Sequence, residues 1–183
     1  MKLVTVFSGL TLLIGGSLAQ GCQSELNGFS LSIARPDETS RPLPLRFLPT
    51  NTTMIYTLGF CSSCSAPTVE HWILQSNSLT AFVPDHGSIK NEFVVANKPL
   101  SFWEAGEISL PVLYPGYCAL FSKGKGLLAA NGRTNVFFAC ENRSPNLAGT
   151  AAFDIYYLPN TTDTASNSTR GHCAAINLEV FPK

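Results

Sequence analysis

The cysteines are the residues of this chain with the most reactive chemistry, and two of them form a Cys-x-x-Cys motif. The motif Cys61-Ser62-Ser63-Cys64 has the spacing of a redox pair, but such a pair needs a helix N-terminus to stabilise its thiolate. A strand-like run precedes it and Pro67 follows, and its spacing to the other cysteines and to His172 fits no common zinc site. We therefore expect up to three structural disulfides, formed by Cys22, Cys61, Cys64, Cys118, Cys140 and Cys173.

Histidines and carboxylates could supply acid–base chemistry, but none of them occurs in a recognisable catalytic pattern. His71 falls in a strand-like run, and the motif Asp85-His86-Gly87 is typical of a turn. The chain has no Gly-x-Ser-x-Gly motif to carry a nucleophilic serine. Glu104 and Glu107 flank a glycine, yet a glycosidase needs two carboxylates that face each other across a cleft. We expect no enzymatic activity, no cofactor and no metal site.

Aromatic side chains could bind a ligand by stacking on the flat face of a sugar. Trp103 is our candidate for this role, because Trp72 falls at an inward position of an alternating run. The alternative is that Trp103 fills the core, as large aromatic residues in β proteins usually do.

The first residues of the chain predict an export signal. Lys2 gives a positive charge, residues 3–14 are mostly apolar, and Ser17-Leu18-Ala19 fits the small-x-small pattern before a cleavage site. We expect residues 1–19 to be the signal peptide and residues 20–183 to form a single domain without a membrane span or a lipid anchor.

The remaining composition also fits a secreted protein. The formal net charge is zero and no basic stripe occurs, which argues against a nucleic-acid partner. N-glycosylation sequons begin at Asn51, Asn160 and Asn167, and a fourth at Asn142 is weakened by the proline that follows it. We therefore expect a secreted glycoprotein.

Alternation of apolar and polar residues dominates the chain and predicts strands. Asn131-Gly132 and the Ser76-Asn77-Ser78 segment are turn signals between such runs, and prolines 42, 44 and 49 indicate an edge strand or an irregular segment. We predict an all-β, disulfide-bonded single domain, a β-sandwich or barrel of about ten to twelve short strands, with a β-trefoil as the alternative. The alternating sets are Phe29, Leu31 and Ile33; Leu43, Leu45 and Phe47; Met54, Tyr56, Leu58 and Phe60; Ile108, Leu110 and Val112; Phe153, Ile155 and Tyr157; and Ile176, Leu178 and Val180.

The second half of the chain resembles fungal secreted cell-wall proteins of the PhiA type. The similarity lies in residues 137–142 (FFACEN), residues 153–157 (FDIYY) and residues 172–180 (HCAAINLEV). In the first half, residues 28–34 resemble the first strand of that family, and residues 72–79 resemble its short hairpin. The resemblance implies an extracellular or cell-wall protein with no established catalytic residues.

These observations favour one particular pairing of two cysteines. Cys140 and Cys173 both adjoin strand-like segments that could lie side by side, and the resemblance points to the same pair. A bond between Cys61 and Cys64 would close a very tight ring. We therefore expect each of these two to bond with a distant partner, Cys22 or Cys118.

The leading functional hypothesis is a non-enzymatic, secreted or cell-wall-associated glycoprotein, fungal if the resemblance holds. The alternative is an extracellular module, effector-like in character, that binds a carbohydrate or another surface through its aromatic residues. The candidate partners are a cell-wall polysaccharide and a surface protein.

Overall fold

All described strands of the protein belong to one sheet. Within the described residues the chain forms fourteen strands and no helix, so the fold class is all-β, as predicted. No helix long and apolar enough to cross a membrane occurs in this part of the chain. The structure is a computed structural model that describes residues 21–34, 43–62, 64–104, 114–122, 124–142, 151–159 and 170–183.

The strands are mostly short, and β14 is the longest with 13 residues. Their number exceeds the ten to twelve expected, because β2 and β8 are fragments of two residues each. The strands are β1 (Leu26–Ala34), β2 (Leu43–Pro44), β3 (Arg46–Pro49), β4 (Ile55–Cys61), β5 (His71–Gln75), β6 (Ser78–Val83), β7 (Gly87–Asn91), β8 (Lys98–Pro99), β9 (Ser101–Glu104), β10 (Tyr117–Ser122), β11 (Lys125–Ala130), β12 (Phe137–Asn142), β13 (Ala152–Tyr157) and β14 (Arg170–Pro182).

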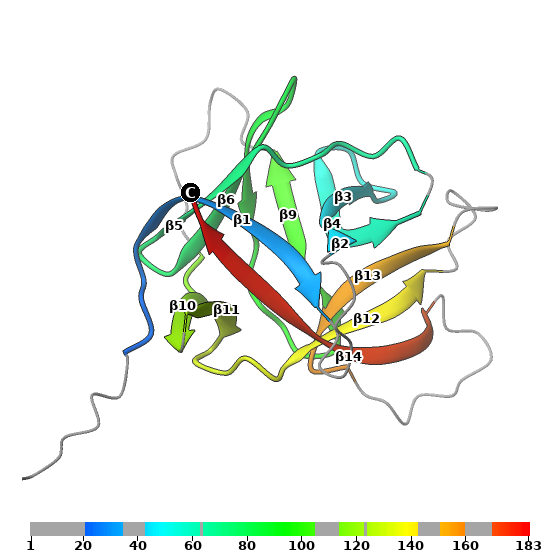
Figure 1. The fold of residues 1–183 in the computed structure, drawn as a ribbon. Coiled ribbons are helices and arrows are strands. Elements are labelled where there is room, and N and C mark those ends of the chain that lie inside the picture. The colour runs from blue at the N-terminus through cyan, green and yellow to red at the C-terminus, as the bar shows by residue number, and fades with distance from the viewer. Residues whose placement is uncertain are drawn as a thin grey trace, which may run out of the picture.

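Nine of these strands form a closed barrel in which every neighbouring pair is antiparallel (Figure 1). Their order is β14-β12-β13-β4-β9-β7-β6-β5-β1, and the pairing of β1 with β14 closes the ring. The other strands pair with members of the ring without belonging to it: β2 with β1, β3 with β4, β8 with β13, and the β10–β11 hairpin with β14. Of the forms that the sequence left open, the barrel is the one adopted.

Strand directions alternate around a closed antiparallel ring, and an odd number of strands cannot satisfy this alternation. One corner of the barrel, where three segments pair with one another, accommodates the ninth strand. There β4, β13 and the continuous segment of β8 and β9 each pair with the other two. Leu100, between β8 and β9, joins all three, because its N–H donates to Ile155 O (2.7 Å) and its carbonyl accepts from Leu58 N (2.8 Å). Without β4 the ring would have eight strands, whose directions can alternate all the way around.

The alternation of β1 and β14 determines which face of each strand is inside. Phe29, Leu31 and Ile33 are buried in β1, and Leu178 and Val180 are buried in β14. The register places Leu31 opposite Val180 and Ile33 opposite Leu178, so the two apolar faces coincide. The predicted inward positions of both strands are confirmed.

Aromatic side chains fill part of the barrel interior. Phe47 of β3 lies between Trp72 of β5 and Phe102 of β9, with ring centroids 5.8 and 5.2 Å from its own. All three side chains are buried. Such rings bury large apolar areas and favour the tilted and edge-on contacts seen here.

The turns predicted at residues 76–78 and 131–132 are confirmed. Ser76 and Asn77 connect β5 to β6 with φ values of 49° and 63°, which is the left-handed backbone of a two-residue hairpin turn. Asn131 and Gly132 likewise have φ values of 49° and 75° after β11. Asparagine and glycine are the residues that tolerate this region at low cost.

The predicted inward direction is wrong for two residues, Leu43 and Met54. Leu43 is 43% exposed, because β2 ends at Pro44 and pairs only with β1, so the expected single strand is split into β2 and β3. Met54 is 56% exposed and has a φ of 64°, which places it in the turn before β4. The strand predicted around residues 108–112 lies outside the described residues.

Candidate functional site

Two disulfides join segments that are distant in the sequence. Cys140 and Cys173 are directly opposite each other on β12 and β14, with a Cα–Cα distance of 4.0 Å, and this predicted pair is confirmed. Cys22 bonds to Cys118 of β10, with a Cα–Cα distance of 5.5 Å. Paired backbone hydrogen bonds of 2.9 and 2.8 Å between Gln23 and Ala119 hold that second disulfide against the sheet.

The expectation that Cys61 and Cys64 bond to distant partners is wrong, because the two bond to each other. Their Cα atoms lie 5.8 Å apart, which is within the usual range for a disulfide. Next to Cys61, Ser62 N donates to Ala151 O at 3.3 Å, just before β13 begins. All six cysteines are therefore paired.

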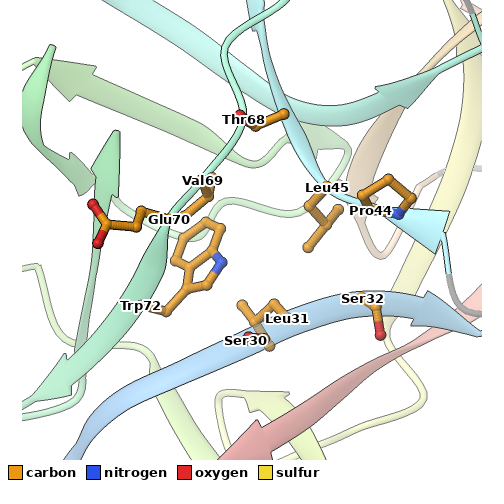
Figure 2. A pocket seen from close by; sticks show the side chains of 9 residues that line it. All are labelled: Ser30, Leu31, Ser32, Pro44, Leu45, Thr68, Val69, Glu70 and Trp72. Atoms are coloured by element: carbon orange, nitrogen blue, oxygen red, sulfur yellow. The ribbon is translucent and has the colours of Figure 1, made fainter. Parts of the chain in front are cut away.

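A side opening interrupts the barrel wall between β1 and β5 (Figure 2). The two strands pair only from Leu26 to Phe29, and the next strand at this edge of β1 is β2, which pairs at Ser32 and Ile33. In the described chain, β1 therefore has no strand partner at this edge between those two pairings. The result is a hollow of about 260 Å³, which we call the side opening.

Trp72 forms the floor of the side opening. Its side chain is only 2% exposed and packs against the rings of Phe47 and Phe102, with both centroid distances 5.8 Å. The indole nitrogen, blue in Figure 2, points into the space bordered by Leu31 and Leu45. Within the described residues no acceptor forms a hydrogen bond with Trp72 Nε1, so this donor faces the hollow without a protein partner.

The wall opposite β1 is held in place by hydrogen bonds. Arg46 Nη1 donates to Ala66 O at 2.7 Å, and an isolated β-bridge joins Arg46 to Thr68. Glu70 N donates to Phe82 O at 2.8 Å. Since these contacts fix both ends of the segment with Thr68 at its centre, the side opening is preformed rather than created by loop movement.

A second cluster lies near one end of the barrel and joins Tyr56, His86 and Glu104. Tyr56 Oη donates to Glu104 Oε2 at 3.1 Å, and His86 Nδ1 lies 3.4 Å from each of these oxygens. Burial, followed by the hydrogen bond and the charge of Glu104, raises the pKa of Tyr56. Beside His86 is an open hollow of about 360 Å³ that Arg46 and Asp85 also line.

This cluster orients an imidazole but does not complete a catalytic triad. His86 Nδ1 faces Glu104, which is the arrangement of a base and its orienting carboxylate. Among the described residues, however, no hydroxyl or thiol forms a hydrogen bond with His86 Nε2. The sequence reasoning missed the cluster, because its members come from β4, the β6–β7 turn and β9.

Asp154 is a buried carboxylate at the corner where β4 meets β13. Its oxygens accept hydrogen bonds from Thr57 Oγ1 at 2.7 Å and from Asn142 Nδ2 at 2.8 Å. Burial raises the pKa of Asp154 from 3.8 to about 6, although both hydrogen bonds act in the opposite direction. The folded protein therefore binds a proton at Asp154 more tightly than the unfolded chain does.

We predict that Asp154 makes the protein less stable as the pH rises from about 4 to about 6. In that range the folded state holds a proton that the unfolded chain has released. The contribution of Asp154 to the free energy of unfolding therefore falls by up to roughly 3 kcal/mol. The D154N substitution should flatten this slope, measured by urea denaturation at several pH values. The exposed Asp85, replaced in the same way, should leave the slope unchanged, and an unchanged slope in D154N would refute the assignment.

The other predicted site residues lie apart from these features. Trp103 is half-buried on β9, opposite Ile55 on β4 and Lys90 on β7, and it lines neither hollow. Its Nε1 is buried without a hydrogen-bond partner. Sugar stacking by Trp103 stays a prediction.

Of the glycosylation sites predicted at Asn51, Asn160 and Asn167 and the predicted signal peptide, the described residues include only Asn51. Asn51 is exposed in the turn before β4, where a glycan could be attached without disturbing the sheet. Asn160 and Asn167, like the predicted signal peptide at residues 1–19, lie outside the described residues.

Comparison of the chain with protein-family models, curated proteins and solved structures gives no match. The resemblance to cell-wall proteins of the PhiA type therefore stays a prediction that rests on the residues quoted for it.

Proposed function

We propose that the protein is a non-enzymatic extracellular glycoprotein that associates with a cell wall. The observation that carries this proposal is the pairing of all six cysteines in three disulfides. Disulfides form and persist in oxidising compartments and are rare in the cytosol. Together with the export signal expected at residues 1–19, they favour an extracellular location.

The absence of a catalytic role is supported by the chemistry of the acid–base groups. The described part of the chain brings one histidine and one carboxylate into contact with a tyrosine, at His86, Glu104 and Tyr56, and offers His86 no nucleophile. Large side chains such as Phe47 and Phe102 are packed and fully buried in the barrel interior. Within the described residues, a histidine without a nucleophile beside it favours a binding role over catalysis.

Association with a cell wall is supported by the resemblance to proteins of the PhiA type. The segments quoted from the second half of the chain correspond to β12, β13 and residues 172–180 of β14, and β12 pairs with both of the other strands. The disulfide that the resemblance implied, Cys140–Cys173, also joins two of these strands. A wall polysaccharide is the partner that follows from this reading.

Cell fractionation of a fungal host that expresses the whole chain tests the proposal. We expect the protein in the medium and the wall fraction, oxidised at all six cysteines and starting near Gln20. The N51Q variant should lose the mass of one glycan, because the exposed Asn51 is the acceptor of its sequon. Recovery from the cytosol with Met1 retained and free thiols would contradict the proposal.

A further inference from the structure

The side opening presents three chemical features to a ligand. Trp72 Nε1 is a donor at the floor, in a side chain that is 2% exposed. Leu31 and Leu45 form apolar walls beside it. At the unpaired edge of β1 between Phe29 and Ser32, backbone N–H and C=O groups face the gap, because successive residues of a strand direct these groups to opposite edges.

A neutral ligand is favoured by the charges around the opening. Of the residues that line it, Glu70 alone is ionisable, and its carboxylate points away from the hollow in Figure 2. An anion would therefore meet no positive charge, and a cation would meet no inward-facing negative charge. A wholly apolar ligand would leave Trp72 Nε1 desolvated without an acceptor, which is unfavourable.

The size of the opening favours a small group rather than a whole ligand. Its volume of about 260 Å³ is below the range typical of pockets that enclose drug-sized molecules. A fitting group combines a carbonyl oxygen for Trp72 Nε1, a methyl group for the walls and an N–H for the edge of β1. The acetamido group has all three.

We propose that the side opening binds the acetamido group of an N-acetylated sugar, of the kind that chitin presents at every residue. The carbonyl oxygen accepts a hydrogen bond from Trp72 Nε1, and the methyl group packs between Leu31 and Leu45. The sugar ring lies at the rim beside the exposed Thr68. The choice of a polysaccharide rests on the proposed wall association, whereas the choice of the acetamido group rests on the lining alone.

Two oligosaccharides that differ only in this group provide the test. Chitohexaose carries an acetamido group at C2 of each ring, where cellohexaose carries a hydroxyl. The chain contains two tryptophans, so in the W103F variant Trp72 is the only indole that emits. We expect a saturable change of Trp72 emission with chitohexaose, at concentrations at least about ten-fold lower than with cellohexaose.

Matched variants locate the binding, measured by calorimetric titration with chitohexaose. W72F removes the donor and keeps an aromatic ring, and it should weaken binding about ten-fold or more, while W103F should bind as the wild type does. T68W narrows the rim at an exposed position, so it should fold normally and weaken binding to a similar extent even if W72F proves unstable.

Equal binding of the two hexaoses, no binding of either, or wild-type binding by folded T68W would overturn the acetamido assignment. Wall binding by the wild-type protein, assayed in parallel on isolated cell walls, separates the two proposals. If the protein binds walls but not chitohexaose, the side-opening proposal fails and the proposed function stands. If it does not bind walls, the proposed function fails.

Discussion

Replacing both Cys22 and Cys118 by alanine is expected to lower the free energy of unfolding by about 4 to 5 kcal/mol. The bond joins residues separated by 96 positions, the largest separation of the three disulfides. In the chain-entropy model, a longer closed loop restricts the unfolded chain more strongly. Urea denaturation of the oxidised protein and of the double variant measures the difference.

The Cys61–Cys64 bond provides the matched control, because it spans a sequence separation of 3. Its removal by the same pair of alanine substitutions should cost only about 1.5 kcal/mol. If the two double variants lost equal stability, loop closure would not be the source of the effect. The Cys22–Cys118 bond would then matter only locally, beside the Gln23–Ala119 bridge.

The second large effect is expected for F47A, which should lower the free energy of unfolding by about 3 to 5 kcal/mol. Phe47 is fully buried, and its ring contacts those of Tyr56, Trp72 and Phe102 at centroid distances of 6.0, 5.8 and 5.2 Å. Alanine would leave a cavity that three rigid rings cannot readily fill. Thermal and urea unfolding measure the loss.

The same substitution at Phe93 is the control. Phe93 is 65% exposed and contacts the ring of Tyr114 at a centroid distance of 4.2 Å. The F93A variant should change the free energy of unfolding by no more than about 0.5 kcal/mol. A loss in F47A as small as this would mean that the aromatic cluster is not part of a tightly packed core.

The strands with regular alternation could be predicted from the sequence, because their inward faces are determined locally. The hairpin of β5 and β6 follows from its turn residues Ser76 and Asn77. The inward position of Trp72 follows from the period of two in the same hairpin. Cys140 and Cys173 could be paired because both adjoin strands of this regular kind.

Features that depend on contacts between distant segments could not be predicted. The pairing of β1 with β14, which closes the barrel, joins opposite ends of the described chain. The side opening exists because β1 and β5 separate after Phe29, which no local pattern signals. The cluster at His86 likewise needs β4 and β9 to be neighbours. The Cys61–Cys64 bond was missed because the ring that it closes was expected to be too tight, whereas the two Cα atoms lie 5.8 Å apart.

Sedimentation with isolated fungal cell walls tests the central claim most directly. The oxidised, secreted protein is incubated with washed walls, and its partition between pellet and supernatant is compared with that of the same protein after reduction and alkylation. The account predicts that the oxidised protein sediments with the walls in a saturable manner and that the reduced protein does not, because binding requires the folded barrel. Oxidised protein that stays in the supernatant, or equal sedimentation of both forms, would contradict it.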